Sequence, residues 1–459
     1  MQTQIQTKIV VFDDDPTGSQ TVHSCLLLTR WDVATLTIGL QHRSPLFFVL
    51  TNTRGMDAVR AAEITREVCK NLGAALDALK QKGVTINPLL VSRSDSTLRG
   101  HYPVETDVMN DVLGPFDAHF MVPAFFEGGR FTRDSTHYIV LNGKATPVHE
   151  TEFARDSVFG YQHSYLPAYV EEKTHGKIRA ADVERFVLND VRGDVMPRLL
   201  KLKNNTCCVV DSENQQDLNH FSEQLIRAAA QGKKFLFRSA ASLLTALARL
   251  PVQPTSADAM RNYVRNARAG AVIVGSHVKK TTEQLGQLLL QENIAPLEVN
   301  VERLAGERQV MLAELQKNIQ QLHEHNKTPV IFTTRVEKQF ASQAERLAFG
   351  ESVSEFLMEV VRNLPPTLGY LISKGGITSN DVLSTGLALK QSEVLGQILP
   401  GVSMVRCPDD HPRYPQMPVV IFPGNVGDEQ ALALVYRRLS ESVKEKENVI
   451  LRQAQDDRK

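Results

Sequence analysis

The sequence predicts two α/β domains, each with a mostly parallel sheet covered by helices, and an active-site cleft between them. Three observations support this fold class. The chain has 459 residues, more than a single hydrophobic core usually spans. Short apolar runs alternate with amphipathic helical stretches, a pattern typical of parallel strands with covering helices. The stretch PVQPTSA at 251–257 interrupts this alternation and predicts a linker between domains 1–250 and 258–445.

The elements of the first half follow from apolar runs and helical periodicity, taken in chain order. Each strand run is short and rich in β-branched or aromatic residues, as KIVVF and LFFVL show. We expect strands at 8–12, 46–50, 89–92, 119–122, 207–210 and 235–237, and helices at 57–81, 103–113 and 214–231.

The same alternation resumes beyond the linker. Runs such as AVIVG and VIFTT read as buried strands, and the longer segments between them have helical periodicity. We expect strands at 271–275, 330–334, 370–373 and 419–422, and helices at 280–292, 303–325, 339–363 and 427–444.

Composition narrows the class of protein. Lys+Arg and Asp+Glu both total 52, so we expect neither a nucleic-acid partner nor a membrane partner. No CxxC or Cys/His cluster occurs among the five cysteines, which we interpret as reduced thiols. No apolar run approaches the roughly 20 residues of a membrane span, and the N-terminus lacks the features of a signal peptide. We therefore expect a cytoplasmic location.

The first candidate motif is VVFDDDPTGSQ, in which Asp13, Asp14 and Asp15 follow the first predicted strand. Ligands of open α/β sheets bind beyond the carboxyl ends of the strands. Three adjacent carboxylates repel one another, so a purely structural role is strained, although Asp and Pro are also common in turns. Carboxylates there suit sugar hydroxyls, Mg²⁺ or removal of a hydroxyl proton.

The second motif is VSRSDSTLRGHY, at the end of another predicted strand. Asp95 could receive a hydroxyl proton from a substrate, and Ser96 offers a short hydrogen-bonding group. Arg99 offers a planar fork that matches a carboxylate or a phosphate. The alternative interpretation is a capped helix start with a surface arginine.

Two further motifs add candidate substrate ligands. TNTR ends a predicted strand and supplies Asn52 and Arg54. PAFFEGGRFTRDSTHY contains Gly128 and Gly129, whose amides could hold an oxyanion, and the charged Arg130. Gly-Gly-Arg also occurs in ordinary turns, so this motif is weak by itself.

The second half predicts a nucleotide site without a known phosphate-loop signature. GxxxxGKS/T is absent, and so are the HRD and DFG motifs of protein kinases. Three glycine-bearing turns instead follow predicted strands, in VGSHVKKTTEQL, ISKGGITSNDVL and FPGNVGDEQAL. Free amides at such turns and helix starts attract phosphates. The candidate nucleotide-binding residues are Gly275, Ser276, Gly375, Gly376, Ile377, Thr378, Gly424, Asn425 and Gly427.

Taken together, these motifs resemble the four-carbon acid sugar kinase family. DDPTGSQ, TNTR, SRSDSTLRG and GGRFT resemble its first half, and VGSHV, TTEQL, SKGGITSNDV, LGQILPGV and PGNVGD its second, in order along the whole chain. The resemblance implies an acid-sugar-binding domain at 1–250 and a nucleotide-binding domain at 258–445. It also implies ATP and Mg²⁺ as cofactors, and phosphorylation of the terminal hydroxyl of threonate, erythronate or a 3-oxo-tetronate. Enzymes of this kind often dimerise, so a homodimer is a further expectation.

The resemblance also assigns residues. Asp14, Asp15, Asp95, Ser96, Arg99 and Arg130 would contact the acid, and Ser276, Gly375, Gly376, Thr378 and Gly424 would hold ATP. One turn departs from the family pattern: GGITSN carries Ile377 where many members carry an acidic residue after the glycine pair.

The expected mechanism is alignment and charge neutralisation, which phosphoryl transfer chiefly needs. Arg99 and Arg130 would clamp the carboxylate of the substrate, and Asp95 or one of Asp13–Asp15, with Asp15 the preferred alternative, would accept the hydroxyl proton. Two alternatives remain open. A haloacid-dehalogenase-like phosphohydrolase would use Asp13 as nucleophile and Asp15 as acid/base, although its late acidic motif is incomplete here. A non-catalytic protein that only binds sugar acids is the other.

Overall fold

The computed structural model describes residues 6–276, 278–335, 343–424 and 426–440. The chain divides into two compact units. Unit 1 contains Met1–Gln253 and Lys390–Gly396, and unit 2 contains Pro254–Leu389 and Gln397–Lys459. A short segment from late in the sequence therefore belongs to the first unit.

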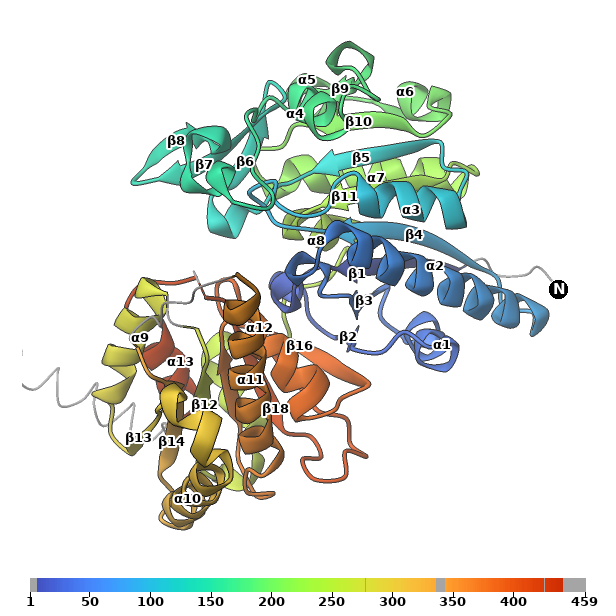
Figure 1. Ribbon diagram of the computed structural model, residues 1–459. Coiled ribbons are helices and arrows are strands. Elements are labelled where there is room, and N and C mark those ends of the chain that lie inside the picture. The colour runs from blue at the N-terminus through green and yellow to red at the C-terminus, as the bar shows by residue number, and fades with distance from the viewer. Residues whose placement is uncertain (1–5, 277, 336–342, 425, 441–459) are drawn as a thin grey trace, which may run out of the picture. The chain divides into compact units, whose positions relative to one another are not determined.

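Unit 1 is built on one long sheet whose strands are buried on both faces. All five residues of LFFVL, for example, are buried, as expected of parallel strands covered by helices on both sides. The strands are β1 (Gln6–Asp13), β2 (Cys25–Leu28), β3 (Leu46–Leu50), β4 (Ile86–Arg93), β5 (Ala118–Val122), β9 (Glu184–Phe186), β10 (Thr206–Val210) and β11 (Phe235–Ser239). The helices are α1 (Val33–Gln41), α2 (Ala58–Gln81), α3 (Val104–Leu113), α4 (Leu166–Lys173), α5 (Leu188–Val191), α6 (Met196–Lys201), α7 (Gln215–Ala230) and α8 (Ala241–Ala248), and Figure 1 shows them flanking the sheet.

The strand order of this sheet is β2-β3-β1-β4-β11-β5-β10-β9, with every pair parallel. After β1 the chain goes to β2 and β3 on one side, and it then crosses to β4 on the other side of β1. Such a reversal of strand order leaves a crevice beyond the carboxyl ends, where ligands of open α/β sheets bind. Gln391–Val394 of β16 (Gln391–Leu399) pairs antiparallel with β2 and closes that edge.

A separate antiparallel sheet of three strands belongs to unit 1. It consists of β6 (Arg130–Arg133), β7 (Thr136–Leu141) and β8 (Lys144–Pro147), and it lies beside the main sheet of that unit in Figure 1.

Unit 2 has a sheet with the order β13-β14-β12-β15-β18-β17, in which only the pairing of β17 with β18 is antiparallel. Its strands are β12 (Ala271–Val274), β13 (Ile294–Val299), β14 (Thr328–Thr333), β15 (Leu371–Lys374), β17 (Val402–Arg406) and β18 (Pro418–Phe422). Its helices are α9 (Lys279–Leu289), α10 (Leu304–Glu324), α11 (Gln343–Arg362), α12 (Gly376–Asp381) and α13 (Ala431–Ser440).

The predicted fold class is confirmed: each unit has a mostly parallel sheet with covering helices. Every predicted strand is present within a few residues of its predicted limits. The predicted helix at 427–444 was wrong at its start, since 427–430 form a turn before α13. Residues 441–444, and 339–342 of another predicted helix, lie outside the described residues. The functional domain limits 1–250 and 258–445 stay a prediction.

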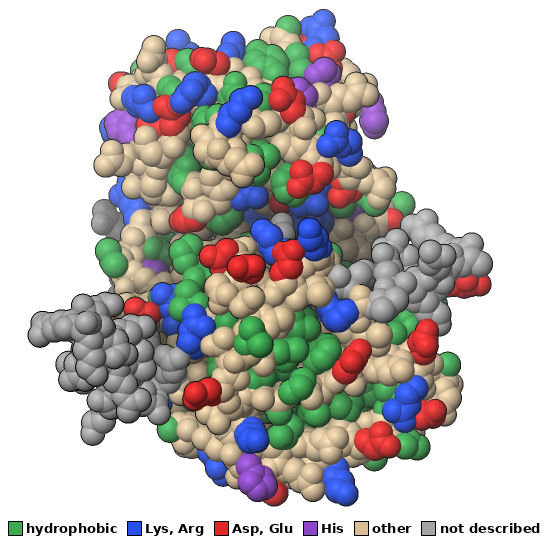
Figure 2. All heavy atoms as spheres, turned by 90° about the vertical axis from the view of Figure 1, so that its left-hand side faces the viewer, with side chains coloured by type: hydrophobic (Ala, Val, Ile, Leu, Met, Phe, Trp, Pro, Cys, Tyr) green, Lys and Arg blue, Asp and Glu red, His purple; other side chains and the backbone are tan. Residues whose placement is uncertain are grey.

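The surface agrees with the balanced charge of the sequence. On the face drawn in Figure 2, basic and acidic side chains are interspersed over the described residues rather than gathered by sign. All five cysteines are buried and unpaired with one another. In the described part of the chain, no helix has both the length and the apolar character that a membrane span requires.

Candidate functional site

The three adjacent aspartates lie at the carboxyl end of β1, at the reversal of strand order in unit 1. Two arginines shared among them, Arg54 and Arg93, relieve their mutual repulsion. Asp14 is fully buried and accepts two hydrogen bonds from Arg54, at 2.5 Å from Nη2 and 3.1 Å from Nε. Asp15 caps the short helix that follows and accepts from Thr17 N at 2.8 Å. Asp14 and Arg54 therefore form the buried ion pair that fixes this loop.

Asp13 is enclosed. It is 0% exposed, and its only charged partner among the described residues at short range is Arg93, whose Nη1 lies 3.3 Å from Oδ1. Its other oxygen, Oδ2, is buried with no hydrogen-bond partner in the described chain. A Cβ added to Gly18 would lie 2.0 Å from Asp13 Oδ1, so the turn backbone covers the carboxyl group. Asp13 is therefore closed off from any ligand in this structure.

The three carboxyl groups differ in the direction of their pKa shifts. Burial raises the pKa of Asp13 to about 8, and the charge of Arg93 only partly opposes the rise. Burial also raises the pKa of Asp14, against the opposing charge of Arg54. At Asp15 burial acts in the same direction, but Arg54, Arg93 and the hydrogen bonds from Thr17 outweigh it and lower its pKa. Asp15 is thus ionised at neutral pH, while Asp13, with its pKa raised to about 8, largely keeps its proton.

Asp95 follows the neighbouring strand β4 and is held by an arginine fork. Its Oδ2 accepts from Arg99 Nε at 2.8 Å and also from the hydroxyl of Thr97. Burial opposes ionisation, but the charges of Arg99 and Arg54 keep the pKa of Asp95 well below its usual range. Asp95 is therefore an ionised acceptor that can orient a hydroxyl group, and its low pKa makes it a weak base.

Arg99 has two further contacts that hold its guanidinium in place. Its Nη1 lies 3.5 Å from Asp156 Oδ2, and its guanidinium carbon lies 5.1 Å from the ring centre of Phe153, a cation–π distance. The predicted clamp residue is therefore fixed from three sides.

Arg130 is the second predicted clamp residue and keeps an unused donor. Its Nη1 donates to Gly128 O at 2.5 Å, and its Nε is buried with no partner among the described residues. Its guanidinium also lies 5.8 Å from the ring centre of Phe125. Burial lowers the pKa of Arg130, and the charge of Asp95 opposes that effect. Arg130 is half-buried, its Nε–H is free, and no carboxylate of the described residues lies at salt-bridge distance, so it would gain from an anionic ligand.

A small hollow opens beside Asp95 and Arg99. Its walls come from the ends of β4, β5 and β11, which supply Met121 and Arg238 among others, and from Tyr169 of α4. Its volume is about 20 Å³, and one water needs about 10–15 Å³ on this measure. The hollow can therefore take one hydroxyl or carboxylate group of a ligand, and the rest of the ligand would lie outside it.

The remaining predicted substrate residues of unit 1 act through their backbone in this structure. Asn52 adopts a left-handed conformation with φ of 53°, and its N–H donates to Asp13 O at 3.2 Å. Ser96 O accepts from the buried His137 at 2.8 Å. Gly129 has φ of 72° and ends the turn before β6.

In unit 2 the three predicted glycine turns meet at the carboxyl ends of their strands. A Cβ added to Gly275 would lie 2.4 Å from Thr378 Oγ1, so only glycine allows this approach of the first and second turns. Gly375 has φ of 116°, which an L side chain rarely adopts, and its N–H donates to Phe422 O at 2.8 Å. Thr281 Oγ1 donates to Gly424 O at 3.3 Å and links the third turn to the first. The three turns are therefore one local structure.

The other predicted nucleotide-binding residues lie next to these three turns or within them. Gly376 is the first residue of α12, and Ile377 beside it is 71% exposed, so this apolar side chain is open to a ligand. Ser276 Oγ is 3.5 Å from Thr281 Oγ1. Gly427 has φ of 79°. Asn425 lies outside the described residues.

Arg335 is a nucleotide-site candidate that sequence reasoning missed. It follows β14, and its Nη2 donates to Ser276 O at 2.7 Å and to Thr282 Oγ1 at 2.8 Å. Its Nε and Nη1 are buried with no partner among the described residues. Burial lowers the pKa of Arg335, because only the distant charge of Glu298 opposes the desolvation. The signal was present, since TTR ends a predicted strand as the other motifs do.

Lys374 is the second residue that was missed. It is fully buried, and its Nζ donates to Pro423 O at 2.5 Å and to Gly424 O at 3.3 Å. Its ammonium also lies 4.2 Å from the ring centre of Phe422. Burial lowers the pKa of Lys374 to about 7. Lys374 thus ties the second glycine turn to the third.

A metal is not held by a dedicated cluster in the described chain: no group of three or more His, Cys, Asp or Glu side chains is arranged to bind an ion there. Mg²⁺ in phosphoryl-transfer sites is usually held by one or two carboxylates, several waters and the phosphates themselves. The oxygen donors near the glycine turns in sequence include the hydroxyls of Ser276 and Thr378 and the carboxylates of Asp381 and Asp428. These donors fit a Mg²⁺ that is bound mainly by the nucleotide phosphates and waters, and they do not fit a site formed by protein ligands alone.

Comparisons with known proteins match the two halves separately. The profile of a sugar-binding N-terminal domain matches residues 9–247, and the profile of a nucleotide-binding C-terminal domain matches residues 271–432. A D-erythronate kinase from Heliobacterium modesticaldum is 33% identical over 155 residues, which span 33% of this chain and 32% of that enzyme. The match thus covers only about a third of that enzyme's length.

Two crystal structures share the fold over nearly the whole chain. A Salmonella typhimurium LT2 protein described as a candidate tRNA synthase has a TM-score of 0.68 at 18% identity, covering 95% of this chain and 98% of that one. Haemophilus influenzae protein HI1011 has a TM-score of 0.63 at 17% identity, covering 94% and 100%. At these identities the likeness concerns the fold alone. With the sugar-binding profile covering more than half of the sequence and the nucleotide-binding profile following it, the chain belongs to the four-carbon acid sugar kinase family.

Proposed function

We propose that this protein is a kinase that uses ATP and Mg²⁺ to phosphorylate the terminal hydroxyl of a four-carbon acid sugar of the threonate, erythronate or 3-oxo-tetronate type. The main observation in support is that each profile-matched half carries its own polar site at the carboxyl ends of its strands. The half matched by the sugar-binding profile has Asp95, Arg99 and Arg130. The half matched by the nucleotide-binding profile has the glycine turns and Arg335. The partial match to a D-erythronate kinase supports the substrate class.

In the acid site, Arg99 and Arg130 would bind the substrate carboxylate. Arg130 offers the buried Nε that lacks a described partner. Burial destabilises the charged guanidinium of Arg130 and so lowers its pKa. A bound carboxylate would stabilise that charge again.

Asp95 would orient the attacking hydroxyl, because it is ionised at neutral pH and lines the hollow at the ends of β4, β5 and β11. Its pKa is too low for it to take the proton early in the reaction. The loose transition state of phosphoryl transfer asks for alignment more than for a strong base, so a weak base suffices. Asp15, also ionised, is the alternative acceptor.

In the nucleotide site, the amides of the glycine turns and the free N–H groups of Arg335 would hold the phosphates. Arg335 has buried N–H groups and no carboxylate among the described residues within salt-bridge distance. A bound anion would offset the free-energy cost of this desolvated charge. Mg²⁺, carried in with the nucleotide, would supply neutralisation of the phosphate charge.

The phosphohydrolase alternative finds no support in the geometry. Asp13 would have to be an ionised, accessible nucleophile. Burial instead raises its pKa to about 8, Gly18 covers it, and it is 0% exposed.

The experiment is a panel assay of the full chain with ATP, Mg²⁺ and the D and L forms of erythronate and threonate together with 3-oxo-tetronates. The kinase proposal expects ADP to form only when an accepted acid is present, with one phosphorylated acid per ADP. Phosphate release from sugar phosphates without ATP would instead favour the phosphohydrolase. Saturable acid binding without turnover would favour a binding protein.

A further inference from the structure

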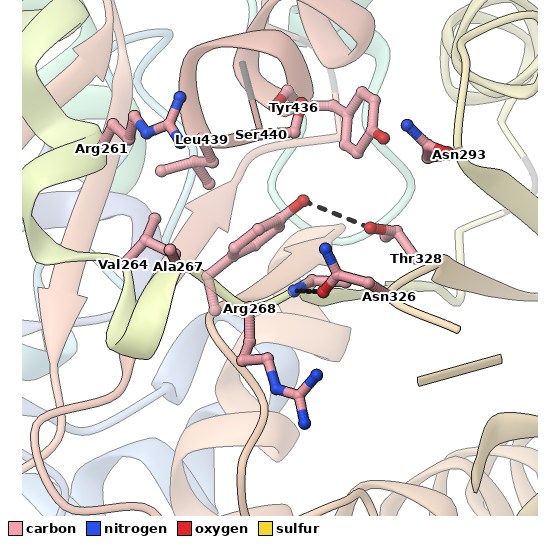
Figure 3. Close-up of a pocket in the computed structure, with 12 residues that line it drawn as sticks. Arg261, Val264, Ala267, Arg268, Asn293, Asn326, Thr328, Tyr436, Leu439 and Ser440 are labelled. Carbon is pink, nitrogen blue, oxygen red and sulfur yellow. Dashed lines mark hydrogen bonds between the residues drawn. The ribbon is translucent and has the colours of Figure 1, made fainter. Parts of the chain in front are cut away.

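A second polar cavity lies in unit 2, at the amino ends of its strands. Asn293 directly precedes β13, Thr328 opens β14, and Tyr370 directly precedes β15 (Figure 3). The glycine turns follow the carboxyl ends of strands in the same sheet. The cavity therefore lies at the amino ends of the strands, and the proposed nucleotide site lies at their carboxyl ends. Its walls are completed by Arg261, Val264, Ala267, Arg268, Ala269, Asn326, Tyr436, Leu439 and Ser440.

Arg261 brings a positive charge with an unused donor to this cavity. Its Nη1 is buried and has no hydrogen-bond partner among the described residues. Its charge reaches the cavity wall: burial raises the pKa of Tyr370, and the charge of Arg261 is one of the effects that oppose that rise. A desolvated guanidinium N–H without an acceptor costs free energy that a bound anion would recover.

Asn326 presents a donor and not an acceptor. Its Oδ1 accepts from Ala269 N at 2.9 Å, so the amide oxygen is occupied and fixes the orientation of the group. The Nδ2 end points into the cavity in Figure 3. Asn326 can therefore donate to a ligand, from a different direction than Arg261.

The charge of the lining residues and the volume of the cavity indicate which ligands it can bind. The lining residues found in the described chain include two arginines and neither Asp nor Glu. Of the two, Arg268 is exposed and its guanidinium is directed away from Asn326 in Figure 3, so Arg261 carries the charge of the cavity. The cavity volume is about 70 Å³, where one water needs about 10–15 Å³ on the same measure. This is room for a group of a few heavy atoms. Tyr436 also lines the cavity, but its hydroxyl hydrogen is committed to Glu292 O at 2.7 Å.

We propose that this cavity binds a small oxyanion with the size and charge of phosphate, either as the free ion or as the phosphate group of a larger molecule. Arg261 supplies charge and a free donor, and Asn326 supplies a second donor held in a fixed direction. Two donors from different directions, one of them charged, suit a tetrahedral anion. The inference does not depend on the activity proposed above, because none of these residues belongs to the glycine turns.

The test is calorimetric titration of the full chain with inorganic phosphate in the presence of a saturating non-hydrolysable ATP analogue. The analogue fills any nucleotide site, so that phosphate must bind elsewhere. Glycerol phosphate serves as a second titrant. Tighter binding of glycerol phosphate would indicate the phosphate group of a larger molecule, and tighter binding of inorganic phosphate the free ion; both support the site.

Two variants locate the binding. Asn326→Asp keeps the acceptor for Ala269 N and replaces the donor by a repelling oxygen, and Asp tolerates the left-handed φ of 53° at this position. Arg261→Met removes the charge. Each should weaken phosphate binding about tenfold or more, while Arg362→Met, which removes an exposed arginine of α11, should leave it unchanged. No phosphate binding with the analogue present, or equal binding by the wild type and both folded variants, would overturn the proposal.

Discussion

Replacing Arg335 by methionine tests whether the unpaired N–H groups of this arginine bind the phosphates of the nucleotide. The wild-type guanidinium is anchored by Ser276 O and Thr282 Oγ1. Its Nε and Nη1 remain buried and without a described partner. Methionine keeps much of the length of the side chain and removes every donor. The expected result is a large loss of kcat/KM for ATP, because the donors to phosphate are lost. A smaller loss of stability should accompany it, because the two anchoring hydrogen bonds are lost as well.

The magnitude follows from the two free donors. A hydrogen bond to a charged group contributes about 1.5–3 kcal/mol, so two of them contribute about 3–6 kcal/mol. At about 1.4 kcal/mol per factor of ten, the loss in kcat/KM is about 10²- to 10⁴-fold. Arg335→Lys keeps the charge but not the fork and should fall between the wild type and Arg335→Met.

The assay is steady-state ADP formation with an accepted acid at saturation and ATP varied. Arg362→Met is the matched control, since it removes an exposed arginine from α11 in the same unit. Thermal unfolding of each variant shows whether the fold survives. If Arg335→Met is folded and retains kcat/KM within about threefold, a difference below 1 kcal/mol, Arg335 does not hold the phosphates and the reasoning is refuted.

Three further predictions concern titrating groups. Asp95→Asn should lower kcat about 10²- to 10⁴-fold with a smaller effect on KM for the acid; near-normal turnover would remove Asp95 from the mechanism. Asp13 has its pKa raised to about 8 in the fold, so the folded chain keeps a proton that the unfolded chain has released. Its contribution to stability therefore falls as pH rises from about 4 to 8. Urea unfolding of Asp13→Asn should show a decline with pH that is shallower by up to about 1.4 kcal/mol per pH unit than in the wild type; parallel curves would contradict the burial argument. Lys374→Met should raise KM for ATP more than it changes KM for the acid, because Lys374 holds the carbonyls of Pro423 and Gly424; equal changes in both constants would speak against a local role.

Most of the strands that are buried on both faces could be predicted from the sequence, although β2 and β17 were not. Runs such as LFFVL carry no alternation and stand out against amphipathic helices, so β1, β3, β4 and β12 were found. Strand β13 was not, since IAPLEV includes a proline and exposed positions, as edge strands do. The pairing of β16 with β2 joins segments more than 360 positions apart, and local periodicity cannot reveal such a contact.

The candidate site was predicted by residue type more than by role. Sequence reasoning placed Asp13, Asp14 and Asp15 together as carboxylates of one site, with Asp15 preferred as proton acceptor. The structure shows in addition that burial and the shared arginines Arg54 and Arg93 shift their pKa values apart. The distinction depends on Arg54 and Arg93, which lie 40 and 80 positions away from their partners. Lys374 was missed because a buried lysine within an apolar strand has no local signature beyond its charge. Arg335 was missed although TTR ends a predicted strand as the other motifs do.

The most direct test of the central claim is whether ADP forms only when a four-carbon acid is present and whether the γ-phosphoryl group of ATP becomes covalently linked to that acid. Mass spectrometry of the full chain incubated with ATP, Mg²⁺ and each acid of the panel measures both products at once. The account predicts, for at least one acid, an added phosphate on that acid with an equal amount of ADP, and no ADP without acid. ADP formation that is independent of every acid, or phosphate release from sugar phosphates without ATP, would contradict it.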